Sequence, residues 1–238
     1  MNSNIKKIAV ICAMSDEAEN IVERLRLDET GFLSSGGPIF FGIVFGKEIF
    51  IAVSRVGKVA AAMAAEEIIT RYSPDCIINL GIAGGVYPGI KTGDICVSSG
   101  FVQYDYDLSS LGIKRGEIDE LGFSVFKADE FLAGFLFDIA KSICQKDRCR
   151  LGIIATGDSF VSSSGTVERL YKDFNASACD MEGGAIAFVC YFYKIPFVAV
   201  RAISDNADEK SPVDFNAFRR EAIAKSTEIA YRFIKELF

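Results

Sequence analysis

Histidine is absent from the 238 residues of this sequence. Its absence excludes Ser-His-Asp and Cys-His catalysis, and it excludes every metal site built on an imidazole. Acid–base chemistry would have to come from Asp, Glu, Lys, Tyr, Cys or water. Carboxylates are therefore the leading candidates for a catalytic role.

Paired-cysteine motifs are also missing. The 7 cysteines form no CxxC motif, and their number is odd. Most of them lie inside apolar runs, where a cysteine behaves as a small buried hydrophobe. We therefore expect free thiols in a reducing, cytoplasmic compartment, and neither a catalytic thiol nor a metal cluster.

Long apolar runs and an excess of positive charge are lacking as well. No apolar run approaches the length of a bilayer span, and the polar start at residues 1–7 is not followed by a signal-peptide pattern. The formal net charge is -6, which provides no basic face for a nucleic acid. We expect neither a membrane nor a nucleic acid as a partner.

What is present fits one α/β domain over residues 1–238. Hydrophobic residues make up 50% of the chain, enough for a large core without disulfides or metals. Apolar runs of strand length alternate with helical patterns, and no linker or repeat interrupts them, which predicts a central mixed β-sheet flanked by helices. The expected strands are 5–14, 39–45, 48–53, 75–80, 93–103, 150–155 and two that end at Asp180 and Asp205; the expected helices are 15–27, 57–72, 128–144, one that includes 167–171, one between the last two strands, and 215–238.

The stretch from Ser177 to Asp205, SACDMEGGAIAFVCYFYKIPFVAVRAISD, organises the predicted site. It is typical of a strand, an apolar helix and a second buried strand. Glu182 and Asp205 therefore follow the ends of two strands that we expect to be neighbours, where α/β proteins bind ligands. The alternative is that both are ordinary acidic caps.

Three further features follow other predicted strands. Glu17 lies in the first turn of a helix, where a dipole-favoured surface carboxylate is the simpler interpretation. The glycine-rich segment 81–85 allows close approach of a ligand to the backbone, but a turn between elements explains it equally. Phe160 either stacks on a base or fills the core. Each of these signals is weak alone.

Taken in order, the motifs carry a more specific signal. They are Ala13-Met14-Ser15-Asp16-Glu17, Gly57-Lys58-Val59-Ala60-Ala61-Ala62, Ala83-Gly84-Gly85, Gly157-Asp158-Ser159-Phe160, Asp180-Met181-Glu182 and Arg201-Ala202-Ile203-Ser204-Asp205. This series resembles the 5′-methylthioadenosine/S-adenosylhomocysteine nucleosidases of the nucleoside phosphorylase/hydrolase family, from about Lys7 to the terminal helix. The resemblance implies a nucleoside phosphorylase-like three-layer α/β/α fold. It also implies hydrolysis of the N-glycosidic bond between adenine and a 5′-substituted ribose.

The resemblance also implies a role for each site residue. Asp205 would protonate adenine N7, steadied by Ser204, and Glu17 would activate water. The other implied contacts are Glu182 and Met181 to the ribose hydroxyls, Arg201 to the water, Phe160 and Val161 to the base, Phe215 to the purine side, Val56 to the 5′ substituent, and Ala83 and Gly84 along the substrate. The implied reaction needs no metal and no organic cofactor.

The chemistry is consistent with these roles. Adenine leaves poorly as an anion, so an acid that protonates it lowers the barrier. Carboxyl groups that converge in an apolar cleft have their pKa values raised by desolvation and mutual repulsion. Nearby carboxylates also stabilise the oxocarbenium character that develops as the base leaves.

The sequence departs from the family pattern at several positions. Ile82 stands where many of these nucleosidases have a hydroxyl residue, and Arg55 replaces a small residue. Segment 108–119 corresponds to the part that a neighbouring subunit lends to the 5′ pocket, so we expect a homodimer. In this segment Leu111 and Ile113 replace aromatic residues that are frequent in the family.

Three alternatives to this function stay open. They are the same chemistry on aminodeoxyfutalosine, a phosphate-dependent purine nucleoside phosphorylase, and a silent nucleoside-binding protein. A phosphorylase would need convergent arginines or a nest of N–H groups to hold phosphate. The combination of Glu17, Glu182 and Asp205 argues against a silent binding protein.

Overall fold

The computed structural model describes residues 5–144, 146–208 and 211–237. Its strands are β1 (Lys7–Cys12), β2 (Asp28–Phe32), β3 (Pro38–Val44), β4 (Lys47–Val53), β5 (Cys76–Gly85), β6 (Ile95–Gln103), β7 (Val125–Lys127), β8 (Cys149–Thr156), β9 (Ala176–Asp180) and β10 (Phe197–Asp205). Its α-helices are α1 (Ser15–Leu25), α2 (Lys58–Tyr72), α3 (Glu130–Ile143), α4 (Ser164–Phe174), α5 (Gly183–Tyr193) and α6 (Ser211–Glu236). The predicted alternation of strands and helices is confirmed.

The centre of the sheet consists of parallel strands that are buried on both faces. β1 pairs in parallel with β4 and β5, and β5 pairs in parallel with β10. Every residue of β10 is buried. Strands covered on both faces are continuous apolar runs, which is why these segments were recognisable without period-two alternation. Antiparallel pairs at β2–β3 and β3–β4 make the sheet mixed, as predicted.

The order of strands differs from the expected one near the predicted site. β9 and β10 are not neighbours: each pairs with β5 instead, β9 antiparallel and β10 parallel. Because β10 also pairs with β6, β6 with β8, and β8 with β9, five strands close into a ring. The prediction of neighbouring strands is therefore wrong, although their carboxyl ends still meet.

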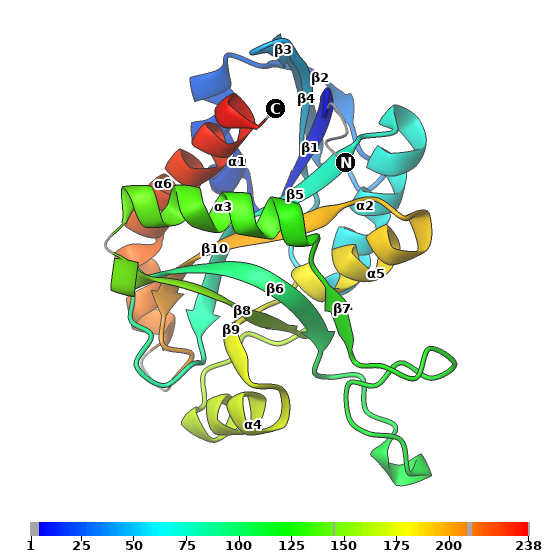
Figure 1. Cartoon of the computed structure of the whole chain (residues 1–238), viewed down its shortest axis with the longest axis vertical. Coiled ribbons are helices and arrows are strands. Elements are labelled where there is room, and N and C mark those ends of the chain that lie inside the picture. The colour runs from blue at the N-terminus through cyan, green and yellow to red at the C-terminus, as the bar shows by residue number, and fades with distance from the viewer. Residues whose placement is uncertain (1–4, 145, 209–210, 238) are drawn as a thin grey trace.

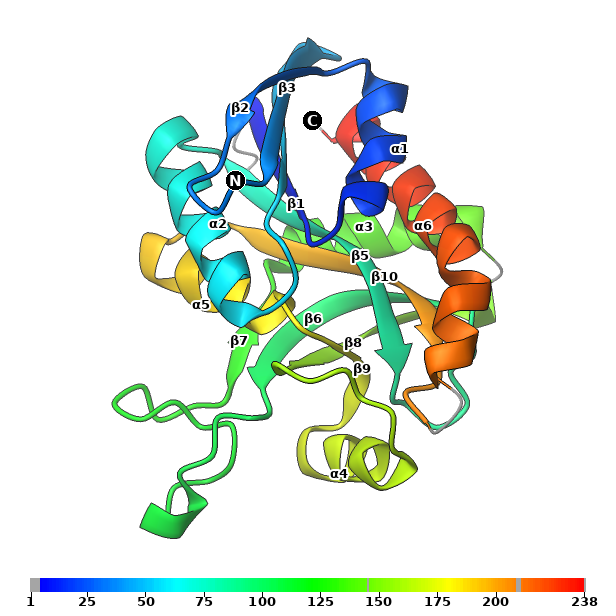
Figure 2. The same ribbon diagram turned by 180° about the vertical axis from the view of Figure 1, so that it is seen from behind.

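Helices cover both faces of the sheet (Figures 1 and 2). α1 and α6 lie on one side, and α2 and α5 lie on the other side. α1 turns one apolar stripe toward the core, including Ile21 and Leu25, whereas α5 is apolar almost all round. Within the described part of the chain, no helix is long and apolar enough to cross a membrane.

Some elements were not anticipated from the sequence. β2 is an edge strand with little apolar pattern, and β7 has 3 residues. Residues 81–85 form the end of β5, not the turn that the glycines suggested. Helix α6 begins at Ser211, earlier than predicted, and its predicted last residue, Phe238, lies outside the described residues.

Gly84 explains why glycine is needed inside β5. A Cβ at this position would lie 2.9 Å from the Cβ of Ala207 and 3.0 Å from the Sγ of Cys179. A side chain here would force β9 and the segment after β10 away from β5, because interior atoms cannot approach so closely. Glycine therefore lets the two strand ends converge on β5.

Candidate active site

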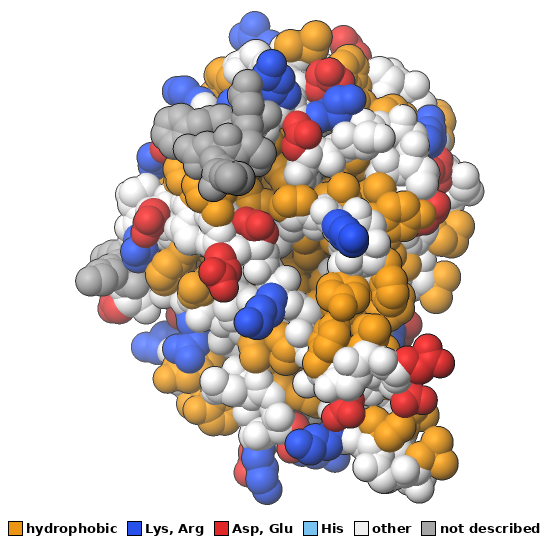
Figure 3. Space-filling model, turned by 45° about the vertical axis from the view of Figure 1, so that its right-hand side comes forward, with side chains coloured by type: hydrophobic (Ala, Val, Ile, Leu, Met, Phe, Trp, Pro, Cys, Tyr) orange, Lys and Arg blue, Asp and Glu red, His pale blue; other side chains and the backbone are white. Residues whose placement is uncertain are grey.

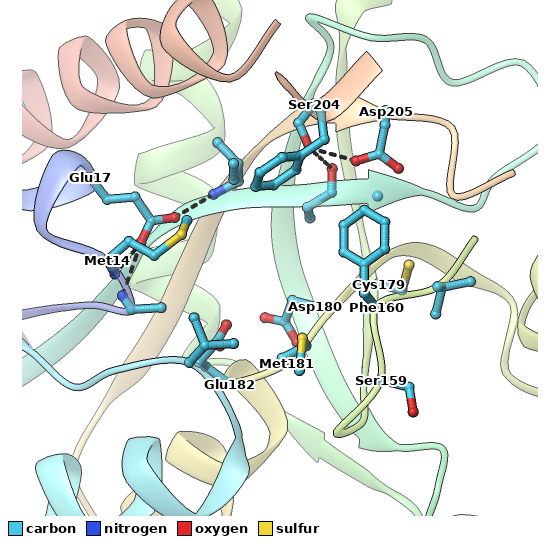
Figure 4. Close-up of a pocket in the computed structure, with 17 residues that line it drawn as sticks. Met14, Glu17, Ser159, Phe160, Cys179, Asp180, Met181, Glu182, Ser204 and Asp205 are labelled. Carbon is cyan, nitrogen blue, oxygen red and sulfur yellow. Dashed lines mark hydrogen bonds between the residues drawn. The ribbon is translucent and has the colours of Figure 1, made fainter. Parts of the chain in front are cut away.

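A pocket lies beyond the carboxyl ends of β1, β5, β8, β9 and β10. Every site residue predicted from the sequence lines it, with the exception of Arg201. The lining consists of Ala13, Met14, Glu17, Val56, Ile82, Ala83, Gly84, Ser159, Phe160, Val161, Cys179, Asp180, Met181, Glu182, Ser204, Asp205 and Phe215. Figure 4 shows Glu17 and Asp205 on opposite sides of this pocket, with Met181 and Glu182 between and below them.

Glu17 is fixed by backbone donors from two strands. Its Oε2 accepts hydrogen bonds from the N–H groups of Ala13 at 2.9 Å and Met14 at 3.0 Å, and its Oε1 accepts one from Ile82 at 3.1 Å. The residue is only 3% exposed. The interpretation of Glu17 as a surface carboxylate is therefore wrong. The helix start turns it inward, onto the ends of β1 and β5.

Asp205 is held by its own chain segment. Its Oδ2 accepts a hydrogen bond from the Ser204 hydroxyl at 2.8 Å, and its Oδ1 accepts one from the Ala207 N–H at 2.8 Å. The Ser204 oxygen also lies 3.3 Å from the carbonyl oxygen of Ala83. The carboxyl group is buried and has one fixed orientation toward the pocket, as Figure 4 shows.

Glu182 occupies the N-cap position of α5 without acting as its cap. No hydrogen bond joins its side chain to the helix it precedes. Instead its Oε1 accepts the N–H of Gly57, at 3.0 Å, from the start of α2. The cap interpretation thus fails for Glu182, and the contact anchors the β4–α2 loop to the pocket.

Arg201 lies behind the carboxylates and does not face the pocket. Its Nε and Nη2 donate to Oδ2 of Asp180 at 3.1 and 2.7 Å, and its Nη2 also donates to Asn79. Its Nη2 is 3.9 Å from Oε2 of Glu182. Arg201 therefore does not line the pocket, and its contact with the attacking water stays a prediction. Sequence reasoning had assigned no role to Asp180 or Asn79.

Burial dominates the electrostatics of this cluster. Burial raises the pKa of the Glu17 carboxyl, although Arg201 and the three backbone donors act in the opposite direction. Burial and the nearby charge of Asp180 raise the pKa of Glu182 to about 7, against the opposing effect of Arg201. Desolvation thus raises the pKa of both acids, and repulsion by neighbouring acids adds to it at Glu182.

Apolar side chains form the walls. Phe160 is 47% exposed, and its ring meets that of Phe215 edge to face, with centroids 5.6 Å apart. Phe160 is thus not core filling, and Phe215 comes from the first turns of α6. An exposed aromatic face beside a pocket is suited to stacking on a flat base.

Several lining residues had no role assigned from the sequence. Met14 and Ser159 lie within the predicted motifs, and Cys179 directly precedes one. A strand end that presents one side chain also presents the backbone and side chains next to it, which was the available signal. Among the described residues, no group of three or more His, Cys, Asp or Glu is placed to hold a metal ion.

Comparison with known proteins is consistent with this site. The family model of the phosphorylase superfamily matches residues 7–235. A 5′-methylthioadenosine/S-adenosylhomocysteine nucleosidase of Haemophilus influenzae (strain PittGG) is 36% identical over 234 residues, which are 97% of this chain and 100% of that protein. An aminodeoxyfutalosine nucleosidase of Campylobacter jejuni is 33% identical over 232 residues, which are 97% of each chain.

Solved structures show the same fold. The 5′-methylthioadenosine/S-adenosylhomocysteine nucleosidase of Helicobacter pylori with butyl-thio-DADMe-Immucillin-A has a TM-score of 0.92 and 31% identity, covering 99% of this chain and 100% of that one. The futalosine hydrolase of Helicobacter pylori has a TM-score of 0.91 and 31% identity, covering 98% and 99%.

Fold, pocket and relatives together define the class of the protein as an N-glycosidic hydrolase. The chain belongs to the phosphorylase superfamily. Within it, the resemblance to the 5′-methylthioadenosine/S-adenosylhomocysteine nucleosidases is confirmed over nearly the full length.

Proposed function

We propose that this enzyme hydrolyses the N-glycosidic bond of 5′-substituted adenine nucleosides, with 5′-methylthioadenosine and S-adenosylhomocysteine as its substrates and adenine as a product. Asp205 is the acid that protonates the base, and Glu17 is the base that activates water. Glu182 and Met181 bind the ribose, and the rings of Phe160 and Phe215 hold the purine.

The observation that carries the proposal is the placement of three buried carboxyl groups on one pocket. Glu17, Glu182 and Asp205 come from α1, the end of β9 and the end of β10, and they are 3%, 6% and 2% exposed. Burying three acids without function would be costly. Figure 4 shows Glu17 and Asp205 on opposite sides of the pocket, so a nucleoside bound between them would have one carboxyl group on each side.

The choice of substrate rests on the relatives. The Haemophilus influenzae relative is named for 5′-methylthioadenosine and S-adenosylhomocysteine, and a Helicobacter pylori structure holds 5′-methylthioadenosine in its active site. In this chain Met14 supplies apolar surface beside Glu17 (Figure 4), and Val56 supplies it next to Gly57, whose N–H binds Glu182. An apolar surface of that kind suits a thioether substituent.

Aminodeoxyfutalosine is the second candidate substrate. The Campylobacter jejuni relative and the Helicobacter pylori futalosine hydrolase favour it by name. A phosphorylase is disfavoured by the pocket itself, because the described residues that line it include no arginine or lysine that could hold phosphate. Arg55 donates to the Ser35 carbonyl, at 2.8 Å, and Arg201 is bound to Asp180.

A panel of nucleosides tests this proposal. We expect adenine release from 5′-methylthioadenosine and S-adenosylhomocysteine, with lower kcat/KM for 5′-deoxyadenosine because it lacks the 5′ substituent. Aminodeoxyfutalosine is the fourth substrate, and a higher kcat/KM for it would replace the first candidate by the second. Each assay is run with and without phosphate. Turnover that requires phosphate and yields ribose 1-phosphate would contradict hydrolysis.

We also propose a cytoplasmic homodimer in which residues 108–119 complete the neighbouring pocket. The seven cysteines form no disulfide, in keeping with a reducing compartment. The segment between β6 and β7 extends away from the body of the molecule, and hydrophobic side chains gather on the side that carries α5 and β7 (Figures 2 and 3). Val59, Met63, Leu111, Tyr191 and Phe192 are exposed apolar side chains of α2, α5 and the extended segment. Exposed apolar surface of this extent is typical of an interface.

A charge at Leu111 tests the dimer. Leu111 is 73% exposed, and we expect Leu111→Asp to weaken the dimer and raise KM for 5′-methylthioadenosine, because the interface would bury an unpaired carboxylate. Ile43→Asp is the matched control, since Ile43 is 72% exposed in β3 at the far end of the molecule (Figure 1). Light scattering gives the oligomeric state. Equal behaviour of both variants would contradict the proposed role of the segment.

A further inference from the structure

A buried polar cluster lies directly behind the pocket and is not explained by the proposed roles. Asp180 ends β9, and its side chain is 1% exposed. Its Oδ2 accepts two hydrogen bonds from Arg201, at 2.7 and 3.1 Å, and one from the Gly183 N–H at 3.1 Å. Its Oδ1 accepts a hydrogen bond from the Thr156 hydroxyl at 2.5 Å. Both oxygens of this carboxylate are therefore held by protein donors, although Asp180 also lines the pocket.

Arg201 has three acidic neighbours but pairs closely with one. Its Nη2 is 2.7 Å from Asp180 but 3.9 Å from Oε2 of Glu182, beyond hydrogen-bond distance. Arg201 also approaches Glu17 over Gly81, where a Cβ would lie 2.6 Å from both Nη1 of Arg201 and Oε1 of Glu17. A buried guanidinium that lost Asp180 would have Glu182 and Glu17 as its nearest replacements.

We propose that Asp180 is a positioning residue of this active site: it holds Arg201 away from Glu182 and Glu17, so that both acids stay directed at the substrate. This inference rests on the proposed function of the pocket. Asp180 acts through Arg201 and needs no contact with the nucleoside. Besides Arg201, Asp180 has Thr156 as a side-chain partner. The Thr156 hydroxyl donates to Asp180 and accepts the Gly184 N–H at 2.7 Å, so it connects Asp180 to the start of α5.

The arrangement also has an electrostatic consequence for Glu182. Asp180 is the second cause, after burial, that raises the pKa of Glu182, and Arg201 opposes it. The charged groups that face this cluster are Glu17 from α1 and Arg201 from β10. Four further groups stay neutral, because burial raises their pKa values. The pKa rises to about 12 for the Cys96 thiol and the Tyr104 phenol, and well above the usual range for the thiols of Cys12 and Cys179. The thiols and the phenol therefore do not change charge near neutral pH, and the carboxyl groups of the cluster are the groups that do.

Asp180→Asn tests the inference, because it keeps the side-chain volume and removes the charge. Arg201 should then move toward Glu182, and KM should rise by about tenfold, the loss expected for one hydrogen bond to a charged group, while kcat changes less. Glu182 would lose a like charge and gain a cation, and both changes favour its ionised form. The acid limb of the kcat/KM profile should therefore move to lower pH.

Asp94→Asn is the matched control. Asp94 is another buried aspartate paired with an arginine, Arg148, and it lies outside the pocket. Its loss should lower the thermal midpoint and leave KM and the pH profile unchanged. If Asp180→Asn shows the same pattern, with only the midpoint lowered, Asp180 is structural and the inference is wrong.

Thr156 provides a second test that does not change charge. Thr156→Val removes the hydroxyl from Asp180 and should move KM and the acid limb in the same directions by a smaller amount, whereas Thr156→Ser keeps the hydroxyl and should match the wild type. An unchanged KM in Thr156→Val would also overturn the inference, even where Asp180→Asn does not fold. Failure of the proposed function is read separately, on the wild-type protein alone, as the absence of adenine release.

Discussion

Asp205→Asn should abolish adenine release while the protein remains folded. The carboxamide keeps the volume of the side chain, and its oxygen can still accept the Ala207 N–H, now 2.8 Å from Oδ1. The Ser204 hydroxyl can accept from the new amide and donate toward the Ala83 carbonyl oxygen. The variant retains these contacts but has no proton to give to the departing base. We expect kcat to fall by about 10³-fold, within the range typical of a positioned acid.

The measurement separates chemistry from binding. Adenine release gives kcat, and calorimetry with a non-hydrolysable adenine nucleoside analogue gives Kd, which should change little. Asp158→Asn is the control, because Asp158 is an exposed acid beside the pocket whose Oδ1 accepts the Lys58 N–H at 2.7 Å. It should keep nearly full turnover. An unchanged kcat in Asp205→Asn would show that another group protonates the base.

The sequence was sufficient to locate the elements that carry the site. Strands β1, β5 and β10 are mainly apolar runs. Polar residues begin at Ser15 shortly after β1, glycines end β5, and Ser204 and Asp205 end β10; all of these features are local. Because the ends of parallel strands meet at one edge of a sheet, the position of Asp205 at this edge was predictable from the strand end. The position of Glu17 favoured a surface carboxylate, and only the family resemblance assigned it to the site.

Strand order was not predictable in the same way. The closure of β5, β10, β6, β8 and β9 into a ring depends on pairings between segments far apart in the chain, and periodicity carries no information on which strands pair. Gly84 is the one residue of the sequence that we can connect with this closure. Its sequence context suggested a turn, whereas it permits the close approach of two strand ends to β5.

The buried network behind the pocket was missed for a related reason. Arg201 and Asn79 are buried polar residues inside the apolar strands β10 and β5, and Thr156 is the buried last residue of β8. Their partners follow from the three-dimensional arrangement of β5, β8, β9 and β10 and not from spacing along the chain. Because a buried charge must be paired, a buried Arg201 requires an acidic partner, but the sequence does not identify that partner as Asp180.

Glu17→Gln should remove turnover and retain nucleoside binding. The amide cannot take a proton from water near neutral pH, so we expect kcat to fall by about 10³-fold, as for loss of a positioned base. The structure adds a cost in stability. Glu17 accepts three backbone N–H groups through its two oxygens, and the amide nitrogen of Gln would face at least one of these donors. An unpaired buried donor costs about 1–3 kcal/mol of unfolding free energy.

Glu67→Gln controls for that cost. Glu67 accepts the Ser34 N–H at 2.8 Å and pairs with Arg71 outside the pocket, so its loss also leaves a backbone donor without its carboxylate. Both variants should unfold at lower denaturant concentration than the wild type, and Glu67→Gln should keep its kcat. If Glu17→Gln lost affinity while kcat persisted, Glu17 would serve recognition and not catalysis.

The pH profile of the wild type gives an independent check on Glu17. A base must be ionised, and burial raises the pKa of Glu17, so kcat/KM should decline on the acid side at a pH above the ordinary glutamate range. Glu182, with its pKa raised to about 7, also loses its charge on the acid side, so both groups contribute to the acid limb of the wild type. Glu182→Gln removes one of the two. An acid limb that persists in this variant, still above the ordinary range, is the result expected if Glu17 is the base; loss of the limb would assign it to Glu182.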